Sequence, residues 1–480
     1  MGASQSSPAH TEGKIDGRPA TLFYKPAEGD DEAGLGYVEG YKVYPTSTWT
    51  KISSKNILAC VPRDATSGDY YFLYVEENPD AAQNPKASPV LFRSAILNNP
   101  PEPLTRDFVA PAVGANCWYF RQDRSTVQPN FHIIVSIASG TGLAADVWKQ
   151  LVKPALDFVK VDEPKDYVLH YTSSENSISD FTRDVLLPQA NLGISQSVML
   201  LSGDGGVVDI VNTILSGQRG QQYTKPNISL LPLGTGNALA HSAGLTQDNS
   251  LGLKAWLRGG LKELPLFCAS FSSGARLLFD EARQERPLHT ADGVAVAHGS
   301  VVASWGLHAG LVADSDTTEF RKFGVERFKM AAKEALAPSD GSAPHVYRAN
   351  VSIQRPGQSE WHAIRDGEHA YVLATLCSQL EKGFTISPAA RELDGKLRLV
   401  HFGPMSGDDA MSIMGKAYQG GQHVEDERVG YEEIDALRIE FREDEGRWRR
   451  VCIDGKIIRV EKDGWVEVRA GQMGVVDLIV

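Results

Sequence analysis

The chain has 480 residues, 42% of them hydrophobic, and a formal net charge of −12. This size allows two or three domains with a large core, and the negative charge argues against non-specific binding to nucleic acid. No apolar run reaches the ~18 residues of a membrane span, and the polar start lacks the pattern of a secretory signal. The five scattered cysteines show neither disulfide nor zinc spacing, so the composition favours a reducing cytoplasm.

The chain begins with MGASQS, which fits the pattern for N-myristoylation at Gly2 and fits an ordinary disordered start equally well. A single acyl chain would hold the protein at a membrane only weakly and reversibly. Residues 1–17 are expected to be disordered. Residues 18–110 are rich in β-formers and turn residues, with the clearest strands at Ile57–Cys60 and Tyr70–Val75, and they are expected to form a small β-rich region.

Residues 128–258 alternate between short apolar runs, glycine-containing loops and helical patterns. This order predicts an α/β domain with a parallel sheet, in which ligands bind beyond the carboxyl ends of the strands. The expected strands are Phe131–Ile137, Tyr167–Thr172, Ser197–Leu201 and Ile228–Pro232. Helices are expected over residues 143–158 and 176–190. A third helix is expected to end at Leu215, and a fourth to follow Asn237.

Residues 259–480 are dominated by strand patterns and predict a mostly antiparallel, β-rich C-terminal domain. Two segments, 325–336 and 408–418, are expected to be helices. The expected strands are Val294–Trp305, Val346–Ile353, Ala370–Leu376, Leu397–Phe402, Ala436–Phe441, Arg450–Val460 and Trp465–Arg469.

Three glycine-rich segments follow strands of the predicted parallel sheet: Ser139–Gly142, Gly203–Gly206 and Gly234–Gly236. Glycine lets backbone amides converge on a phosphate group, although one such segment alone also fits a plain turn. Three at one sheet edge favour a phosphate site. The sequence contains neither a P-loop motif nor the signature motifs of protein kinases.

Asp204 lies between two of these glycines at a strand end. An aspartate there fits a turn or a helix N-cap, and it also fits a general base that accepts the proton of an attacking hydroxyl.

Two longer motifs narrow this interpretation: SGDGGVVDIVN at Ser202–Asn212 and LPLGTGNALA at Leu231–Ala240. They resemble the signature loops of the diacylglycerol-kinase catalytic family, most closely its sphingosine-kinase branch, and the resemblance continues through Phe320–Phe328 and Val451–Gly455. It implies a lipid kinase that transfers phosphate from ATP, with Mg²⁺, to the primary hydroxyl of a sphingosine-type long-chain base. It also implies peripheral association with membranes and a lipid-binding role for residues 259–480.

The resemblance assigns roles to individual residues. Asp204 matches the catalytic base, Asp454 matches an aspartate associated with Mg²⁺, and Asp209 matches an acidic residue on the following helix. The positions that match the nucleotide site are Ser139, Gly140, Thr141, Gly142, Thr172, Gly203, Gly205, Gly234, Thr235, Gly236, Asn237, Arg321 and Arg327.

The chain departs from the family at two places. Ser136–Gly140 replaces a segment that usually reads N-P-x-[SG]-G. Lys456 stands where the family has the glutamate of a D-G-E motif, which reverses the local charge next to Asp454. Lys456 is compatible with direct contact to phosphate and with weakened binding of Mg²⁺.

A sphingoid base carries an ammonium group beside its reactive hydroxyl, and an ammonium group favours a nearby carboxylate. Asp314 and Asp316 match the segment that supplies this contact in sphingosine kinases, with Asp316 as the better match, and both also fit a solvated turn. Three alternatives stay open: a ceramide kinase, a diacylglycerol kinase, and a catalytically weak lipid-binding regulatory module.

Overall fold

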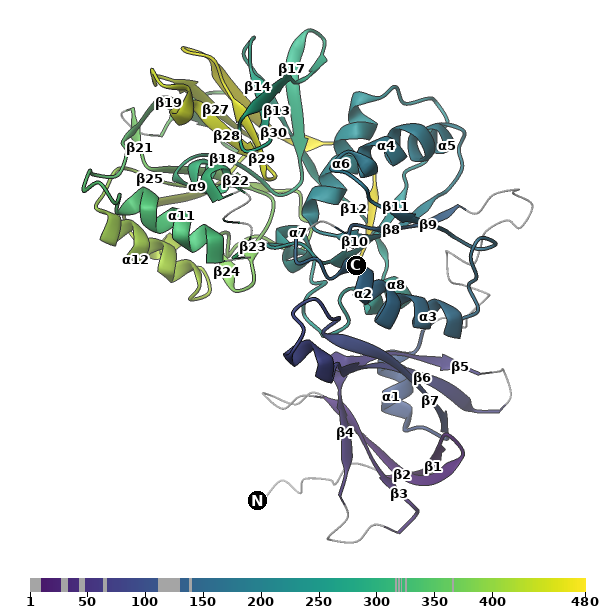
Figure 1. The fold of residues 1–480 in the computed structure, drawn as a ribbon. Helices are drawn as coiled ribbons and strands as arrows, with labels where there is room; N and C mark the ends of the chain where they lie inside the picture. The colour runs from purple at the N-terminus through teal and green to yellow at the C-terminus, as the bar shows by residue number, and fades with distance from the viewer. Residues whose placement is uncertain are drawn as a thin grey trace.

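The structure is a computed structural model that describes residues 10–26, 33–42, 48–63, 67–110, 130–137, 140–315, 317, 320, 322–323, 326–364 and 367–480. An N-terminal β-rich region, a central α/β region and a C-terminal β-rich region follow one another along the chain (Figure 1). The expected fold class is therefore confirmed. Within the described residues, no helix is long and apolar enough to cross a bilayer.

The N-terminal region contains one seven-stranded antiparallel sheet in the order β4-β3-β2-β1-β7-β6-β5. We expected residues 1–17 to be disordered, but Thr11–Ile15 forms β1 because it pairs along its length with β2. The strands are β1 (Thr11–Ile15), β2 (Arg18–Lys25), β3 (Gly34–Glu39), β4 (Thr50–Ser53), β5 (Ile57–Pro62), β6 (Asp69–Glu77) and β7 (Val90–Asn98).

Helix α1 (Glu102–Phe108) covers one face of this sheet with Leu104 and Phe108, which lie four residues apart on the same side of the helix. The outer face of β5–β7 packs against the central region and shares its hydrophobic core. Tyr71 on β6 meets Phe158 edge-on, with ring centroids 5.0 Å apart. The N-terminal region is therefore joined to the central region by a continuous apolar interface.

The central region contains a six-stranded sheet in the order β12-β31-β11-β10-β8-β9. All neighbours are parallel except β12 and β31. The last strand of the described chain thus returns to this sheet, so its residues come from both sides of the expected domain limit at 258. The strands are β8 (Phe131–Val135), β9 (Val168–Tyr171), β10 (Ser197–Ser202), β11 (Asn227–Pro232), β12 (Leu261–Glu263) and β31 (Asp477–Ile479).

Helices cover both faces of this sheet, as its fully buried strands require. Along β10, Met199 and Leu201 face one layer of helices, and Val198 and Leu200 face the other. Two helices contain a π-helical turn shortly before a proline, at Pro154 and Pro188, because proline cannot donate the backbone hydrogen bond. The helical segments are α2 (Ala144–Val147), a π-turn (Trp148–Val152), α3 (Lys153–Phe158), α4 (Ser177–Phe181), a π-turn (Thr182–Leu186), α5 (Leu187–Asn191), α6 (Asp204–Ser216), α7 (Ala238–Ser242) and α8 (Leu253–Arg258).

The C-terminal region packs two antiparallel sheets face to face, and their inner faces share one core that includes Trp305 and Phe441. The first sheet has β13 (Leu266–Phe271), β16 (His289–Ala291), β17 (Val294–Gly299), β19 (Tyr347–Gln354), β20 (His362–Ala363), β21 (Glu368–His369), β27 (Ala436–Phe441) and β30 (Trp465–Gln472). The second has β14 (Arg276–Phe279), β15 (Gln284–Pro287), β18 (Val302–Gly306), β22 (Tyr371–Thr375), β25 (Leu397–Phe402), β26 (Val429–Ile434), β28 (Arg450–Ile453) and β29 (Lys456–Arg459). A separate hairpin joins β23 (Gln379–Glu381) to β24 (Phe384–Thr385).

Three helices cover the outer face of the second sheet: α9 (Leu307–Ser315), α11 (Glu326–Leu336) and α12 (Gly407–Ala417). We expected one strand over Val294–Trp305, but β17 and β18 are separate, because the amides between them bind a carboxylate described below. A solvated turn was one alternative for Asp314, and the structure instead places this residue in α9. Gly310 lies within this helix and lowers its helix propensity, which obscures the helical pattern in the sequence.

Candidate active site

Three loops, which follow the neighbouring strands β8, β10 and β11, meet at the carboxyl edge of the central sheet. Their glycines are in direct backbone contact: a Cβ on Gly140 would lie 2.5 Å from the Cα of Gly234, and a Cβ on Gly203 would lie 2.8 Å from the same atom. Larger residues would push the loops apart. The expected convergence of Gly140, Gly203 and Gly234 is therefore observed, and it leaves their backbones open toward the cleft.

Asn237 fixes the shape of the third loop. Its Oδ1 accepts a hydrogen bond from the Gly234 amide (2.8 Å), and its Nδ2 donates to the carbonyls of Gly234 (2.9 Å) and Pro232 (3.3 Å). The backbone of Asn237 is left-handed (φ +55°), a conformation that asparagine tolerates. The side chain thus positions the loop, and the neighbouring Thr235 and Gly236 line the cleft.

Asp204 is the first residue of α6 and points toward the start of α7. Its Oδ2 accepts a hydrogen bond from the Leu239 amide (3.2 Å), whereas its buried Oδ1 has no hydrogen-bond partner among the described residues. Burial raises the pKa of Asp204 to about 7, and the nearby Asp454 carboxyl adds to the rise. The side chain can therefore exchange a proton near neutral pH.

Asp454, in the turn between β28 and β29, holds the junction of β17 and β18. Its Oδ2 accepts from the Ser300 amide (2.6 Å), and its Oδ1 accepts from the amides of Val301 (3.1 Å) and Val302 (2.6 Å). Burial raises the pKa of Asp454 to about 6, although these amides favour its charged form. Backbone amides thus occupy three of the roughly four lone-pair positions of the Asp454 carboxylate, which leaves little capacity to bind a metal ion.

Lys456 and Asp209 form an ion pair across the cleft. The Lys456 Nζ on β29 lies 2.7 Å from the Asp209 Oδ1 on α6, and the two side chains are 36% and 21% exposed. The pair links the C-terminal region to the central region beside Asp454. The positive charge of Lys456 is therefore balanced by the acidic residue on α6.

The other predicted nucleotide-site residues divide into three groups. Thr172, Gly205 and Arg327 line the same cleft, and the Thr172 Oγ1 accepts a hydrogen bond from the Ile137 amide (3.2 Å). Thr141 donates to the Leu233 carbonyl (3.0 Å) and joins the first loop to the third, next to Gly142. Ser139 and Arg321 lie outside the described residues, as do Gly2 and Asp316, which were predicted for acylation and for the lipid headgroup.

Asp314, predicted to contact the lipid headgroup, is engaged elsewhere. It lies on α9, where its Oδ1 accepts from Arg450 (2.9 Å) and its Oδ2 accepts from Arg447 (3.2 Å). It is not among the residues that line the cleft. In this conformation its charge is neutralised by two arginines.

The cleft is one cavity of about 690 Å³ with chemically different ends. The glycine loops, Asp204 and Asp454 form the polar end. The apolar end lies between the second C-terminal sheet and helices α9, α11 and α12, and its walls include Leu307, Leu311, Phe328, Leu336, Met414 and Tyr418.

Sequence reasoning did not single out three polar or aromatic residues of this wall: His308, Tyr371 and Tyr418. The position of His308 in the cavity wall could not be predicted, because α9 was not expected to be a helix. Tyr371 lies in a strand that was predicted, but its direction depends on which face of the sheet the helices cover.

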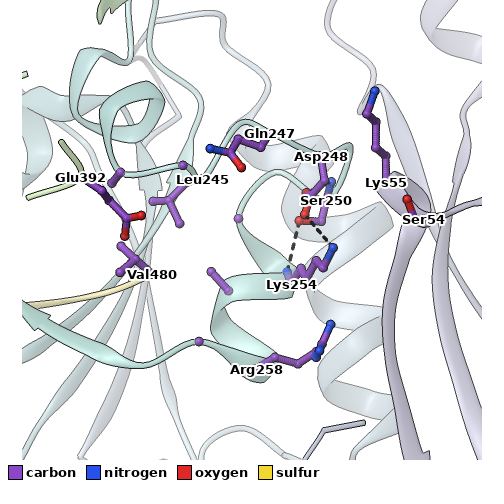
Figure 2. Close-up of a pocket in the computed structure, with 15 residues that line it drawn as sticks. Ser54, Lys55, Leu245, Gln247, Asp248, Ser250, Lys254, Arg258, Glu392 and Val480 are labelled. Carbon is purple, nitrogen blue, oxygen red and sulfur yellow. Dashed lines mark hydrogen bonds and ion pairs between the residues drawn. The ribbon is translucent and has the colours of Figure 1, made fainter. Parts of the chain in front are cut away.

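A second cavity, of about 440 Å³, lies between the N-terminal sheet and α8 and shares no lining residue with the cleft (Figure 2). Its charged groups have partners within the protein. Lys254 lies 3.4 Å from Asp248, and Arg258 donates to the Asp107 carbonyl (2.6 Å). These contacts are consistent with a structural role at this junction.

Comparisons with known proteins agree with this arrangement. Residues 130–269 match the model of the diacylglycerol kinase catalytic domain. Sphingosine kinase 1 of Homo sapiens is 23% identical over 357 residues, which cover 68% of this chain and 85% of that protein. The chain is thus sphingosine-kinase-like, and its residues 130–269 match a diacylglycerol kinase catalytic domain. It is a lipid kinase.

Other relatives of this lipid kinase are similarly distant. Sphingosine kinase 2 of Arabidopsis thaliana is 21% identical over 369 residues, which cover 70% of each chain. Among solved structures, a diacylglycerol kinase from Bacillus anthracis str. Sterne is 13% identical, with a TM-score of 0.44, and covers 74% of this chain and 97% of that one.

Proposed function

We propose that the protein transfers the γ-phosphate of ATP to the primary hydroxyl of a sphingosine-type long-chain base. One observation carries this proposal: a single cavity joins the glycine loops to an apolar pocket, and Asp204 lies at the polar end. A phosphate donor and a lipid chain can therefore occupy the same cavity with the reacting groups near one carboxylate.

In this proposal the glycine loops receive the ATP phosphates through backbone amides, and Arg327 adds positive charge from the opposite side of the cleft. The described residues contain no group of three or more side chains suited to hold a metal ion. Mg²⁺ would bind together with the ATP phosphates and neutralise part of their negative charge. On the protein side, Asp204 Oδ1 has no hydrogen-bond partner among the described residues and would be available to the ion.

Asp204 acts as the general base. The lipid hydroxyl transfers its proton to the Asp204 carboxylate as its oxygen bonds to the γ-phosphorus, and the bond from that phosphorus to the ADP oxygen breaks. A base works best when its pKa lies near the working pH, and the pKa of Asp204 is about 7. The amides of α7 keep the carboxylate oriented during the transfer.

The proposed lipid follows from the relatives, which are named sphingosine kinases. We retain Asp316 as the predicted contact to the ammonium group. The double ion pair of Asp314 with Arg447 and Arg450 favours a different candidate, a lipid with a neutral headgroup such as ceramide or diacylglycerol.

We also propose that the enzyme works at a membrane surface. Three large side chains, Met330 on α11 and Met411 and Tyr418 at α12, are each 41–46% exposed. Met411 and Tyr418 also line the cavity. Apolar side chains at the mouth of a lipid pocket favour contact with a bilayer. Acylation of Gly2 stays a prediction.

The test is transfer of labelled phosphate from Mg-ATP in mixed micelles that contain sphingosine, ceramide or diacylglycerol. Labelling of sphingosine alone supports the proposal. Labelling of ceramide or diacylglycerol alone would keep the reaction and move the substrate to the neutral lipids. Labelling of no lipid by folded protein would favour the lipid-binding regulatory module.

A further inference from the structure

The wall of the cavity includes a small polar cluster that the proposed reaction does not use. On β18, Ser304 Oγ lies 2.7 Å from His308 Nδ1 in the first turn of α9. The Tyr371 ring, on the neighbouring strand β22, lies edge-on to His308 with centroids 6.1 Å apart. His308 and Tyr371 both line the cavity.

His308 has one ring nitrogen left for a ligand. Burial lowers the pKa of His308 to about 4, so the ring is neutral at pH 7. Nδ1 is engaged by Ser304, and the described residues place no other hydrogen bond on the ring. In either tautomer Nε2 is a hydrogen-bond donor or acceptor, and a hydroxyl group can serve as the partner in both cases.

Tyr371 carries an oxygen that the fold does not need. The residue is 1% exposed, and its hydroxyl has no hydrogen-bond partner among the described residues. Its ring stacks on Phe402 at 4.9 Å, a contact that phenylalanine would make equally well. An unpaired buried hydroxyl destabilises a protein, so its presence in the cavity wall favours a ligand group that pairs with it.

The cluster lies close to the reacting end of the cavity. Ser304 is two residues along β18 from Val302, whose amide binds Asp454. Two residues of a strand span roughly 7 Å. The cluster therefore borders the first carbons of a bound lipid chain, not its far end.

We propose that His308, which Ser304 orients through Nδ1, and Tyr371 form a subsite for a second hydroxyl group near the head of the lipid, so that the enzyme prefers a 4-hydroxylated long-chain base over the same base without that hydroxyl. This inference rests on the proposed function. A site whose buried polar groups pair with a substrate hydroxyl disfavours the analogue that lacks it, because those groups are then left unpaired.

The test compares kcat/KM for sphinganine and 4-hydroxysphinganine in mixed micelles. We expect the wild type to prefer the 4-hydroxylated base by roughly 10- to 100-fold, in line with the loss of one or two buried hydrogen bonds. Tyr371→Phe removes only the unpaired oxygen and keeps the ring, so it should fold and reduce the preference several-fold. His308→Leu should reduce it further.

Leu311→Met is the matched control, because Leu311 lines the same cavity without a polar group. It should leave the ratio of the two kcat/KM values unchanged. Equal use of the two bases by the wild type would overturn the inference, as would an unchanged ratio in Tyr371→Phe and His308→Leu. Failure to label either base would overturn the proposed function, and this inference with it.

Discussion

Replacing Asp204 with asparagine should stabilise the protein at pH 8 while removing its activity. The pKa of Asp204 rises from 3.8 to about 7 in the folded protein, mainly through burial. Since each pKa unit corresponds to about 1.4 kcal/mol, ionising this carboxyl in the folded state costs about 4 kcal/mol at pH 8. Asparagine avoids that cost but accepts a weaker hydrogen bond from Leu239, so we expect a net gain of about 1–3 kcal/mol.

The pH dependence of this gain follows from the direction of the pKa change. The folded state holds the Asp204 proton more tightly than the unfolded state, so the associated stability is present below pH 3.8 and is lost between pH 3.8 and 7. At pH 5 the folded carboxyl is still protonated, and the cost is only about 1.6 kcal/mol. The advantage of asparagine should therefore shrink by about 2–3 kcal/mol from pH 8 to pH 5.

The assay is urea unfolding of the nucleotide-free protein in EDTA at both pH values. Asp408→Asn is the matched control, because Asp408 is an exposed aspartate in the first turn of α12. It should change the free energy of unfolding by no more than about 0.5 kcal/mol at either pH. A destabilised Asp204→Asn protein at pH 8, or the same gain at both pH values, would refute the reasoning.

Three further predictions concern activity and stability. The kcat/KM for phosphate transfer should fall about tenfold per pH unit below pH 7, because the Asp204 base must be ionised; a flat profile between pH 5 and 7 would contradict this role. Phe158→Ala should lower the free energy of unfolding by about 2 kcal/mol in urea, since it removes the contact with Tyr71, and a loss below about 0.5 kcal/mol would exclude a stabilising interface. Lys456→Met should raise KM for ATP several-fold, because it leaves Asp209 unpaired in the cleft. Adding Asp209→Asn should restore part of the ATP affinity. Equal KM values in the single and double variants would argue against charge balance.

Much of the fold could be predicted because its strands are apolar runs bounded by turn residues. β10 and β11 are examples, since each is buried on both faces and ends at a glycine-rich loop. Helix α9 could not be predicted, because Gly310 interrupts its pattern and its stability comes from packing on β18 and β28. β31 joins the central sheet only through long-range pairing with β11, which no local pattern indicates.

In the candidate site, too, some features could be predicted from the sequence and others could not. The approach of the glycine loops could be predicted, because the carboxyl ends of parallel strands lie at one edge of a sheet. The hydrogen bond from the Ser300 amide to Asp454 joins residues 154 positions apart in the sequence, and the ion pair of Lys456 with Asp209 joins residues 247 positions apart. The sequence indicates that these residues matter, but only the tertiary structure determines which partners they meet.

The central claim is that Asp204 serves a lipid kinase reaction on a sphingoid base. The most direct measurement is transfer of labelled phosphate from Mg-ATP to sphingosine by the wild type and by Asp204→Asn, with ATP binding measured on both proteins. We predict labelling by the wild type, a loss of at least about 100-fold in the variant, and similar ATP affinity in both. Near-normal transfer by Asp204→Asn, or no transfer to sphingosine by the wild type, would contradict the account.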